Sequence, residues 1–291
     1  MDAAIAAPSA AQDRSKPASA PSGGSAPHAV GSVGANYLLH LADNALVLGQ
    51  RNAEWCGHGP ILEEDIAMAN ISLDLVGQAR LLYQEAARRI GGEATEDTLA
   101  YFRDAPEFRN YTLLELPHRV GLVGYAQSDI DYSVTLVRNF LYGSLMVMVW
   151  DALQRSSDEA LAAIAAKSLK EAKYHLRHAS DWMVRLGDGS EESHARMQAA
   201  LDHLMPYTQE FWATSELESQ AVATGAAVDV PSLRTAWDAL VNEVLAEATL
   251  KRPALPAGYI TQGKSGIHSE HLSYLLGEMQ GLARAHPGAQ W

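Results

Sequence analysis

The segment KSLKEAKYHLRHASDW, residues 167–182, carries an acid and two histidines at the spacing of a helix. Glu171 precedes His175 by four residues and His178 follows it by three, so a helix would hold these side chains on neighbouring turns. Carboxylates and imidazoles at such spacing are the ligands of metal sites in helical bundles. The segment therefore raises the question of whether the chain itself binds a metal.

A di-iron site in a bundle needs a carboxylate from each of two helices and a Glu-x-x-His motif from each of two others. The position three residues before His175 is alanine. The helix expected over 61–90 carries Asp74-Leu-Val-Gly-Gln78, with leucine and glutamine where a glutamate and a histidine are needed. The helix before it offers only Asp43. We therefore expect no complete set of six ligands.

Two other histidines have a glutamate three residues before them, namely His118 with Glu115 and His194 with Glu191. Pro117 lies inside the first motif at a helix entrance, where the spacing need not be helical. The second motif occupies the opening turn of a helix, where acids interact favourably with the helix dipole and face water. Neither motif is expected to bind metal.

The polar residues of the expected bundle have a second interpretation, as hydrogen-bonded core groups. Small and apolar residues recur at steps of three and four along 165–186 and place His175 on the buried face. We expect it to pair with Glu171, because a buried histidine beside an acid is more often a core pair than a metal ligand. His178 continues the more polar side and is expected to be exposed. The expected polar core positions are Asp43, Asp74, Glu171 and His175.

Composition limits the classes of function. The formal charge of −13 argues against nucleic acid and anionic membranes as partners, since both need basic patches. The single cysteine, Cys56, excludes a disulfide framework and a cysteine-ligated iron–sulfur cluster, and fits the reducing cytoplasm.

Residues 1–35, rich in Ala, Ser, Pro and Gly, are expected to be a disordered tail and not a signal peptide. No stretch approaches the roughly 18 apolar residues of a membrane span.

The elements that must position these residues are helices. The apolar pattern keeps helical spacing from Tyr37 onward, and no convincing period-2 strand is present. Two helix pairs of similar length, joined by a longer connection, fit a ferritin-like bundle with additional C-terminal helices, and fit an ordinary bundle equally well. We expect one such domain over 36–291, with helices at 37–55, 61–90, 96–103, 119–155, 158–186, 191–223, 232–251 and 268–285.

The stretch Gly258-Tyr-Ile-Thr-Gln-Gly263-Lys264-Ser265 matches the phosphate-binding pattern GxxxxGK[ST]. That motif works between a strand and a helix of an α/β sheet, and no sheet is expected here. The segment is therefore interpreted as a Gly-rich surface loop before the last helix, with Lys264 available to an anionic ligand.

Three long motifs carry a resemblance to a known family: LGQRNAEWCGHGPILEEDIAMANISLDLVGQAR at 48–80, KSLKEAKYHLRH at 167–178, and GIHSEHLSYLLGEMQ with the terminal PGAQW at 266–291. They resemble the C subunit, the PaaC type, of the bacterial phenylacetyl-CoA 1,2-epoxidase. The likeness covers the chain from about Tyr37 to Trp291.

The resemblance implies a ferritin-like helical fold and a multicomponent monooxygenase for aerobic phenylacetate breakdown. It implies a homologous catalytic A subunit, which carries the di-iron centre and receives the CoA thioester, and a small B subunit, which assists assembly. It also implies a reductase with flavin (FAD) and an iron–sulfur cluster that delivers electrons from NADPH. This chain would then be a structural component without catalytic, cofactor or metal ligands of its own.

The resemblance also implies where ligands were lost relative to the catalytic component, with only His175 retained. The degenerate positions are Ala45, Leu75, Gln78, Tyr142, Ala172 and His175.

Two alternatives remain open from the residues. One is a self-sufficient ferritin-like oxygenase with an unusual metal site at Glu171, His175 and Asp74. The other is a binding module for CoA thioesters that uses Lys264 or Arg252. Aromatic candidates for a subunit interface are Trp55, Tyr259 and the terminal GAQW.

Overall fold

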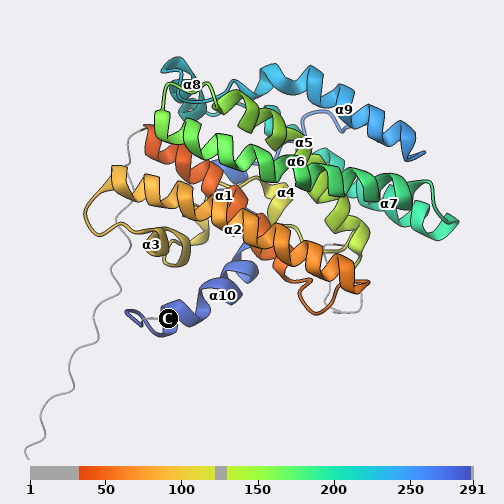
Figure 1. Cartoon of the computed structure of the whole chain (residues 1–291), viewed down its shortest axis with the longest axis horizontal. Helices are drawn as coiled ribbons and strands as arrows, with labels where there is room; N and C mark the ends of the chain where they lie inside the picture. The colour runs from red at the N-terminus through yellow and green to blue at the C-terminus, as the bar shows by residue number, and fades with distance from the viewer. Residues whose placement is uncertain (1–32, 122–129, 290–291) are drawn as a thin grey trace, which may run out of the picture.

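The computed structural model describes residues 33–121 and 130–289. Within these ranges the chain is helical and forms no strand, apart from one isolated bridge between Gln262 and Ile267. Figure 1 shows the long helices lying along one another, with shorter helices at both ends of the bundle. The all-α fold class expected from the sequence is confirmed.

The centre of the molecule is a ferritin-like bundle of two helix pairs. The first two long helices pack against each other over their length, as do the other two, and the second and fourth meet across the pairs. In Figure 1 the orange and green helices of this last contact run across the front of the molecule. The four are α1 (Val33–Ala53), α2 (Leu62–Ile90), α5 (Tyr132–Leu153) and α6 (Glu159–Gly187).

Local signals explain where these helices begin and end. The carboxylate of Asp158 accepts the backbone N–H of Leu161 at the start of α6, which is an N-cap. Three acids fill the first turn of α2, and Gly91, with φ 75°, ends it in a conformation that favours glycine. Gly187 ends α6 where a side chain would overlap Ala248.

Shorter helices surround the bundle. Those that follow the bundle are the additional C-terminal helices expected from the sequence, and α9 packs on α5 and α6 while α10 packs on α3 and α1. The helices are α3 (Glu96–Tyr101), α4 (Thr112–Glu115), α7 (Glu191–Leu204), α8 (Glu216–Ala223), α9 (Arg234–Glu247) and α10 (Glu270–Ala285). Four 3₁₀ turns join them in the described chain: η1 (Ala105–Glu107), η3 (Met205–Trp212), η4 (Val230–Leu233) and η5 (Gly263–Ser265).

The helix expected over 119–155 begins later than predicted. Helix α5 starts at Tyr132 after the N-cap Asp131, residues 116–121 are not helical, and 122–129 lie outside the described residues. The guanidinium of Arg138 donates to the carbonyls of Leu116 and Pro117 at 2.7 and 2.8 Å. These bonds tie the irregular connection to α5, and the helix itself begins where the Asp131 carboxylate accepts the backbone N–H of Ser133 at 2.8 Å.

The single helix expected over 191–223 is three elements. Pro206 opens the 3₁₀ turn η3, because proline cannot donate to an α-helical ladder. Ser215 then caps α8 in a capping box with Glu218, whose carboxylate accepts the Ser215 N–H at 2.9 Å. Pro206 and the capping box of Ser215 and Glu218 are both visible in the sequence. The apolar residues keep helical spacing across them, so the periodicity predicted one continuous helix.

The described part of the chain begins slightly before the expected boundary at 36. Helix α1 starts at Val33 and Ala35 is fully buried, while residues 1–32 of the expected tail lie outside the described residues.

Helix α5 is long and apolar enough to cross a membrane by length and composition, but 89% of its apolar window is buried within the fold. It is the central core helix of the bundle.

Candidate functional site

The six positions that the resemblance implies as degenerate ligand positions lie on all four bundle helices and are buried. Alanine and leucine carry no donor atom, so three of the six positions cannot ligate a metal. Burial raises the pKa of the Tyr142 phenol well above its usual range, so it stays protonated. The positions, each at most 7% exposed, are Ala45 on α1, Leu75 and Gln78 on α2, Tyr142 on α5, and Ala172 and His175 on α6.

Gln78 and His175, at two of the positions that keep a side chain able to ligate a metal, form hydrogen bonds between α2 and α6. His175 Nε2 lies 3.0 Å from Asp74 Oδ2, and Gln78 Nε2 donates to Glu171 Oε2 at 2.9 Å. Burial lowers the pKa of His175 below its ordinary value despite the opposing effect of Asp74, so the ring is neutral near pH 7. The pairs join two helices and do not converge on a common point.

These contacts correct two expectations. The partner of His175 is Asp74 on another helix and not Glu171 on its own, because the i−4 carboxylate turns toward Gln78. Asp74 and Glu171 are not core residues: both are half-buried at the rim, and 41% of the Asp74 side chain is exposed. The burial expected of His175 is observed.

His178 was expected on the exposed side and is instead largely buried. Its Nε2 lies 3.0 Å from Glu64 Oε2 on α2, and Tyr132 of α5 donates to the same oxygen at 2.7 Å. Glu64 is itself buried, so two partners satisfy a carboxylate that would otherwise be costly to desolvate. This cluster ties the start of α2 to α5 and α6.

Asp43 is a polar core residue as expected, and its partners are charged. Arg103 forms an ion pair with it, Tyr83 donates to it at 2.5 Å, and the backbone N–H of Arg109 donates at 2.8 Å. The Asp43 and Arg103 side chains are at most 4% exposed. The carboxylate is fully used inside the fold and is not available to a metal.

The Glu115–His118 motif does not form a metal site. Glu115 accepts from the backbone N–H of Ser269 at 2.6 Å and pairs with His268 Nδ1 at 2.8 Å. His118 turns away, with Nε2 2.7 Å from the carbonyl of Arg51. The two side chains thus bind different segments, as the proline between them suggested.

The second such motif lies at the start of α7. Glu191 is exposed, and His194 Nδ1 lies 2.7 Å from the carbonyl of Gly187 at the end of α6. Across the residues that the structure describes, no group of three or more His, Cys, Asp or Glu side chains is placed to hold a metal ion. The residues present at the degenerate positions therefore do not fit a di-iron centre.

The loop that matches the phosphate-binding pattern is anchored to the protein. The backbone N–H of Lys264, which would face a phosphate, donates to buried Glu210 at 2.9 Å. Lys264 Nζ forms an ion pair with Glu218 at 2.8 Å, and both side chains are 7% exposed. A side chain at Gly263 would overlap the carbonyl oxygen of Asn110, so packing explains this glycine.

The cations considered for a CoA thioester are therefore paired internally. Lys264 is not available to an anionic ligand, which corrects that expectation. Arg252 forms an ion pair with Asp238 at 2.5 Å, and its guanidinium also lies over the Trp237 ring.

The aromatic candidates for an interface differ in their exposure. Trp55 is a core residue that donates to Thr135 at 2.7 Å, whereas Tyr259 is 40% exposed. Gln290 and Trp291 lie outside the described residues. Of these candidates, Tyr259 is the aromatic side chain that the structure leaves accessible to a partner.

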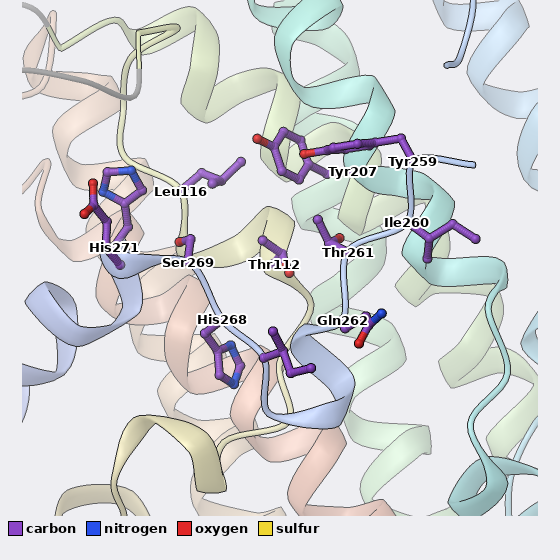
Figure 2. Close-up of a pocket in the computed structure, with 12 residues that line it drawn as sticks. Thr112, Leu116, Tyr207, Tyr259, Ile260, Thr261, Gln262, His268, Ser269 and His271 are labelled. Atoms are coloured by element: carbon purple, nitrogen blue, oxygen red, sulfur yellow. The ribbon is translucent and has the colours of Figure 1, made fainter. Parts of the chain in front are cut away.

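A cleft of about 540 Å³ opens beside this loop, as Figure 2 shows. Tyr207 and Tyr259 stack edge to face on one side, and His268 and His271 lie on the other. Both ring nitrogens of His268 are bonded, to Glu115 and to the carbonyl of Phe108. Burial lowers the pKa of His271, so its ring is neutral near pH 7.

Several of the residues that organise these sites were not identified from the sequence. Arg103 lies 60 residues from Asp43, and Glu210 lies 54 residues from Lys264, so no local pattern connects them. The capping-box pattern of Ser215 and Glu218 is visible in the sequence and could have predicted that Glu218 lies at a helix start. It does not indicate that Lys264 is the partner of Glu218.

Comparison with known proteins places the chain among relatives. Residues 26–291 match the family described as phenylacetic acid catabolic protein. The chain is 44% identical over 255 residues to the C subunit of the 1,2-phenylacetyl-CoA epoxidase of Escherichia coli (strain K12), and the alignment covers 88% of this chain and 98% of that relative. The resemblance carried by the three sequence motifs is confirmed.

Proposed function

Since the chain belongs to the family of phenylacetic acid catabolic proteins, we propose that it is the structural, non-catalytic subunit of a 1,2-phenylacetyl-CoA epoxidase. One observation carries the proposal: the degenerate ligand positions hold Ala45, Leu75 and Ala172, and those with donor atoms are hydrogen-bonded or protonated. A chain with this bundle has no place to assemble two irons. Its contribution to ring epoxidation is to bind and support a partner that has one.

The proposed assembly contains the components that the resemblance implied. A homologous catalytic subunit holds the di-iron centre, which supplies oxygen activation, and receives the CoA thioester. A further small subunit helps the complex to assemble, and a reductase with FAD and an iron–sulfur cluster delivers electrons from NADPH. We propose that the assembly works in the cytoplasm, where a chain with the single cysteine Cys56 has no need of disulfides.

The physical chemistry of an empty site supports loss of the ligands. Carboxylates buried without iron would lack a counter-charge, and each would cost several kcal/mol of folding free energy. Apolar residues at Ala45, Leu75 and Ala172 remove that cost and fill the bundle. A subunit that pairs with a catalytic homologue can lose its own metal ligands in this way and still keep the fold that forms the interface.

The alternatives have less support. A metal site at Glu171, His175 and Asp74 would have to break both hydrogen-bonded pairs between α2 and α6. A CoA site at Lys264 or Arg252 would have to break ion pairs with Glu218 or Asp238. No contact in the described chain favours either function.

Reconstitution tests the proposal. The consumption of phenylacetyl-CoA is measured with NADPH and reductase for this chain alone, for the catalytic subunit by itself, and for both together. We expect turnover only when the catalytic subunit is present, and a large increase when this chain is added in equimolar amount. Turnover by this chain with reductase alone, or no effect of its addition, would contradict the proposal.

A further inference from the structure

The outer face of α6 is basic in an otherwise acidic protein. The segment KSLKEAKYHLR, residues 167–177, carries four cations and one acid, whereas the whole chain has a formal charge of −13. Within the described parts of the chain, the contacts of α6 with acids of α2 in this region use His175 and His178, and none of these cations forms an ion pair. The exposed cations are Lys167, Lys170, Lys173 and Arg177.

The adjoining face of α2 is apolar and exposed. Leu62, Ile66, Leu73 and Val76 follow one another at steps of four, seven and three residues, which places them on one side of a helix. Their exposed fractions are 71%, 52%, 70% and 41%. Single exposed apolar residues are ordinary, but a row of four on one helix face marks an interaction site.

The basic and apolar faces lie on neighbouring helices. The contact between Asp74 and His175 joins α2 to α6 beside Leu73 and Tyr174, their chain neighbours, which are both exposed. Tyr174 is 45% exposed and its ring lies 5.7 Å from the Arg177 guanidinium. Figure 1 shows the two helices crossing the same side of the molecule. We call this the α2/α6 surface.

The shape of the surface favours a protein over a small ligand. The hollow at Val76 and Arg80 has a volume of about 190 Å³, and a second hollow of about 380 Å³ lies at one end of the surface, beside Glu64 and Trp182. Sites for small molecules and cofactors enclose roughly 300–1,000 Å³, and none of the four exposed cations lines either hollow. A helix face with an aromatic and aliphatic centre and a charged rim is instead typical of protein interfaces.

We propose that the α2/α6 surface docks a protein partner whose facing patch is apolar at its centre and carries carboxylates at its edge. The charge selects this occupant, since four unpaired cations beside an apolar row attract an acidic patch and repel a basic one. The inference rests on the proposed function for the identity of the partner, which is the catalytic subunit of the epoxidase.

Matched variants test the surface by binding to the catalytic subunit. Leu73→Ser removes an apolar contact, and Lys170→Glu/Lys173→Glu reverses the charge. The control Arg155→Glu/Lys251→Glu reverses two exposed cations elsewhere on the chain. We expect the Kd to rise about tenfold or more in the first two variants and to be unchanged in the control. Wild-type affinity should also fall as salt increases.

The outcomes distinguish a failure of the docking surface from a failure of the proposed function. Wild-type binding that neither Leu73→Ser nor the double reversal weakens would overturn the docking surface and leave the proposed function intact. No binding of the wild-type chain would overturn the proposed function and this assignment with it. Calorimetric binding of phenylacetyl-CoA to the isolated chain that the double reversal abolishes, or self-association that Leu73→Ser abolishes, would assign the surface to another occupant and overturn the proposal.

Discussion

At the scale of single residues, the polar groups of the core act in pairs. Asp43 and Arg103 are both almost fully buried, and each would be costly without the other. The sequence predicted Asp43 as a polar core residue, because an acid on the buried face of a helix needs a partner. The sequence could not predict Arg103 as the partner. Arg103 lies 60 residues from Asp43 along the chain, and only the fold brings the two side chains together.

We expect Asp43→Asn to lower the free energy of unfolding by about 3–5 kcal/mol, because it leaves the Arg103 guanidinium buried without a counter-charge. Urea unfolding followed by circular dichroism measures this. Asp181→Asn, at an exposed acid of α6, is the matched control and should change stability little. Equal stability of the two variants would show that the buried pair is not important.

The pair between His268 and Glu115 predicts a pH effect. Burial lowers the pKa of His268, but the hydrogen bond that its ring donates to Glu115 and the negative charge of that carboxylate outweigh this and raise the pKa above the ordinary value. A raised folded-state pKa contributes stability that is fully present below the unfolded pKa of about 6.5 and is lost as the pH rises through the folded value. His268→Gln should therefore destabilise the chain more at about pH 6 than at about pH 8.5.

Unfolding free energies of wild type and His268→Gln across this pH range provide the measurement. His286→Gln, at an exposed histidine near the end of the described chain, is the control and should change stability little. A stability difference that grows with rising pH would have the wrong sign and contradict the assignment.

At the scale of elements, the long helices were predictable and their interruptions were not. Helices α2 and α6 begin and end within one residue of the ranges expected from periodicity, because caps and glycines mark their ends. The start of α5 was missed, because its N-cap at Asp131 lies inside the range that was interpreted as one continuous helix. The degenerate ligand positions followed from the family resemblance, whereas the pairing of Asp74 with His175 depends on the packing of α2 on α6.

The loop that resembles a phosphate-binding motif is a structural anchor, and it provides a prediction at this scale. Lys264→Met leaves Glu218 buried and unpaired and should lower stability by about 3–5 kcal/mol. The double variant Glu218→Gln/Lys264→Met should recover much of the loss, because no unpaired charge remains. A double-mutant cycle by urea unfolding measures the coupling, and additive effects would contradict the anchor.

At the scale of the whole molecule, the proposed role does not require the metal site typical of a ferritin-like fold. Three of the six implied ligand positions hold small or apolar side chains, the phosphate-like loop fastens the C-terminal segment, and the α2/α6 surface is left exposed. The acidic net charge argued against nucleic acid as a partner. It could not show the local basic face of α6, because a total charge carries no information about position.

The central claim is that this chain supports a catalytic partner without a metal centre of its own. The most direct test is the iron content per chain of the isolated protein, expressed with ample iron and purified without chelator, beside the catalytic subunit prepared in the same way. We predict no stoichiometric iron on this chain and about two irons on the catalytic partner. About two irons on this chain, lost in His175→Ala, would contradict the account and place a metal site between α2 and α6.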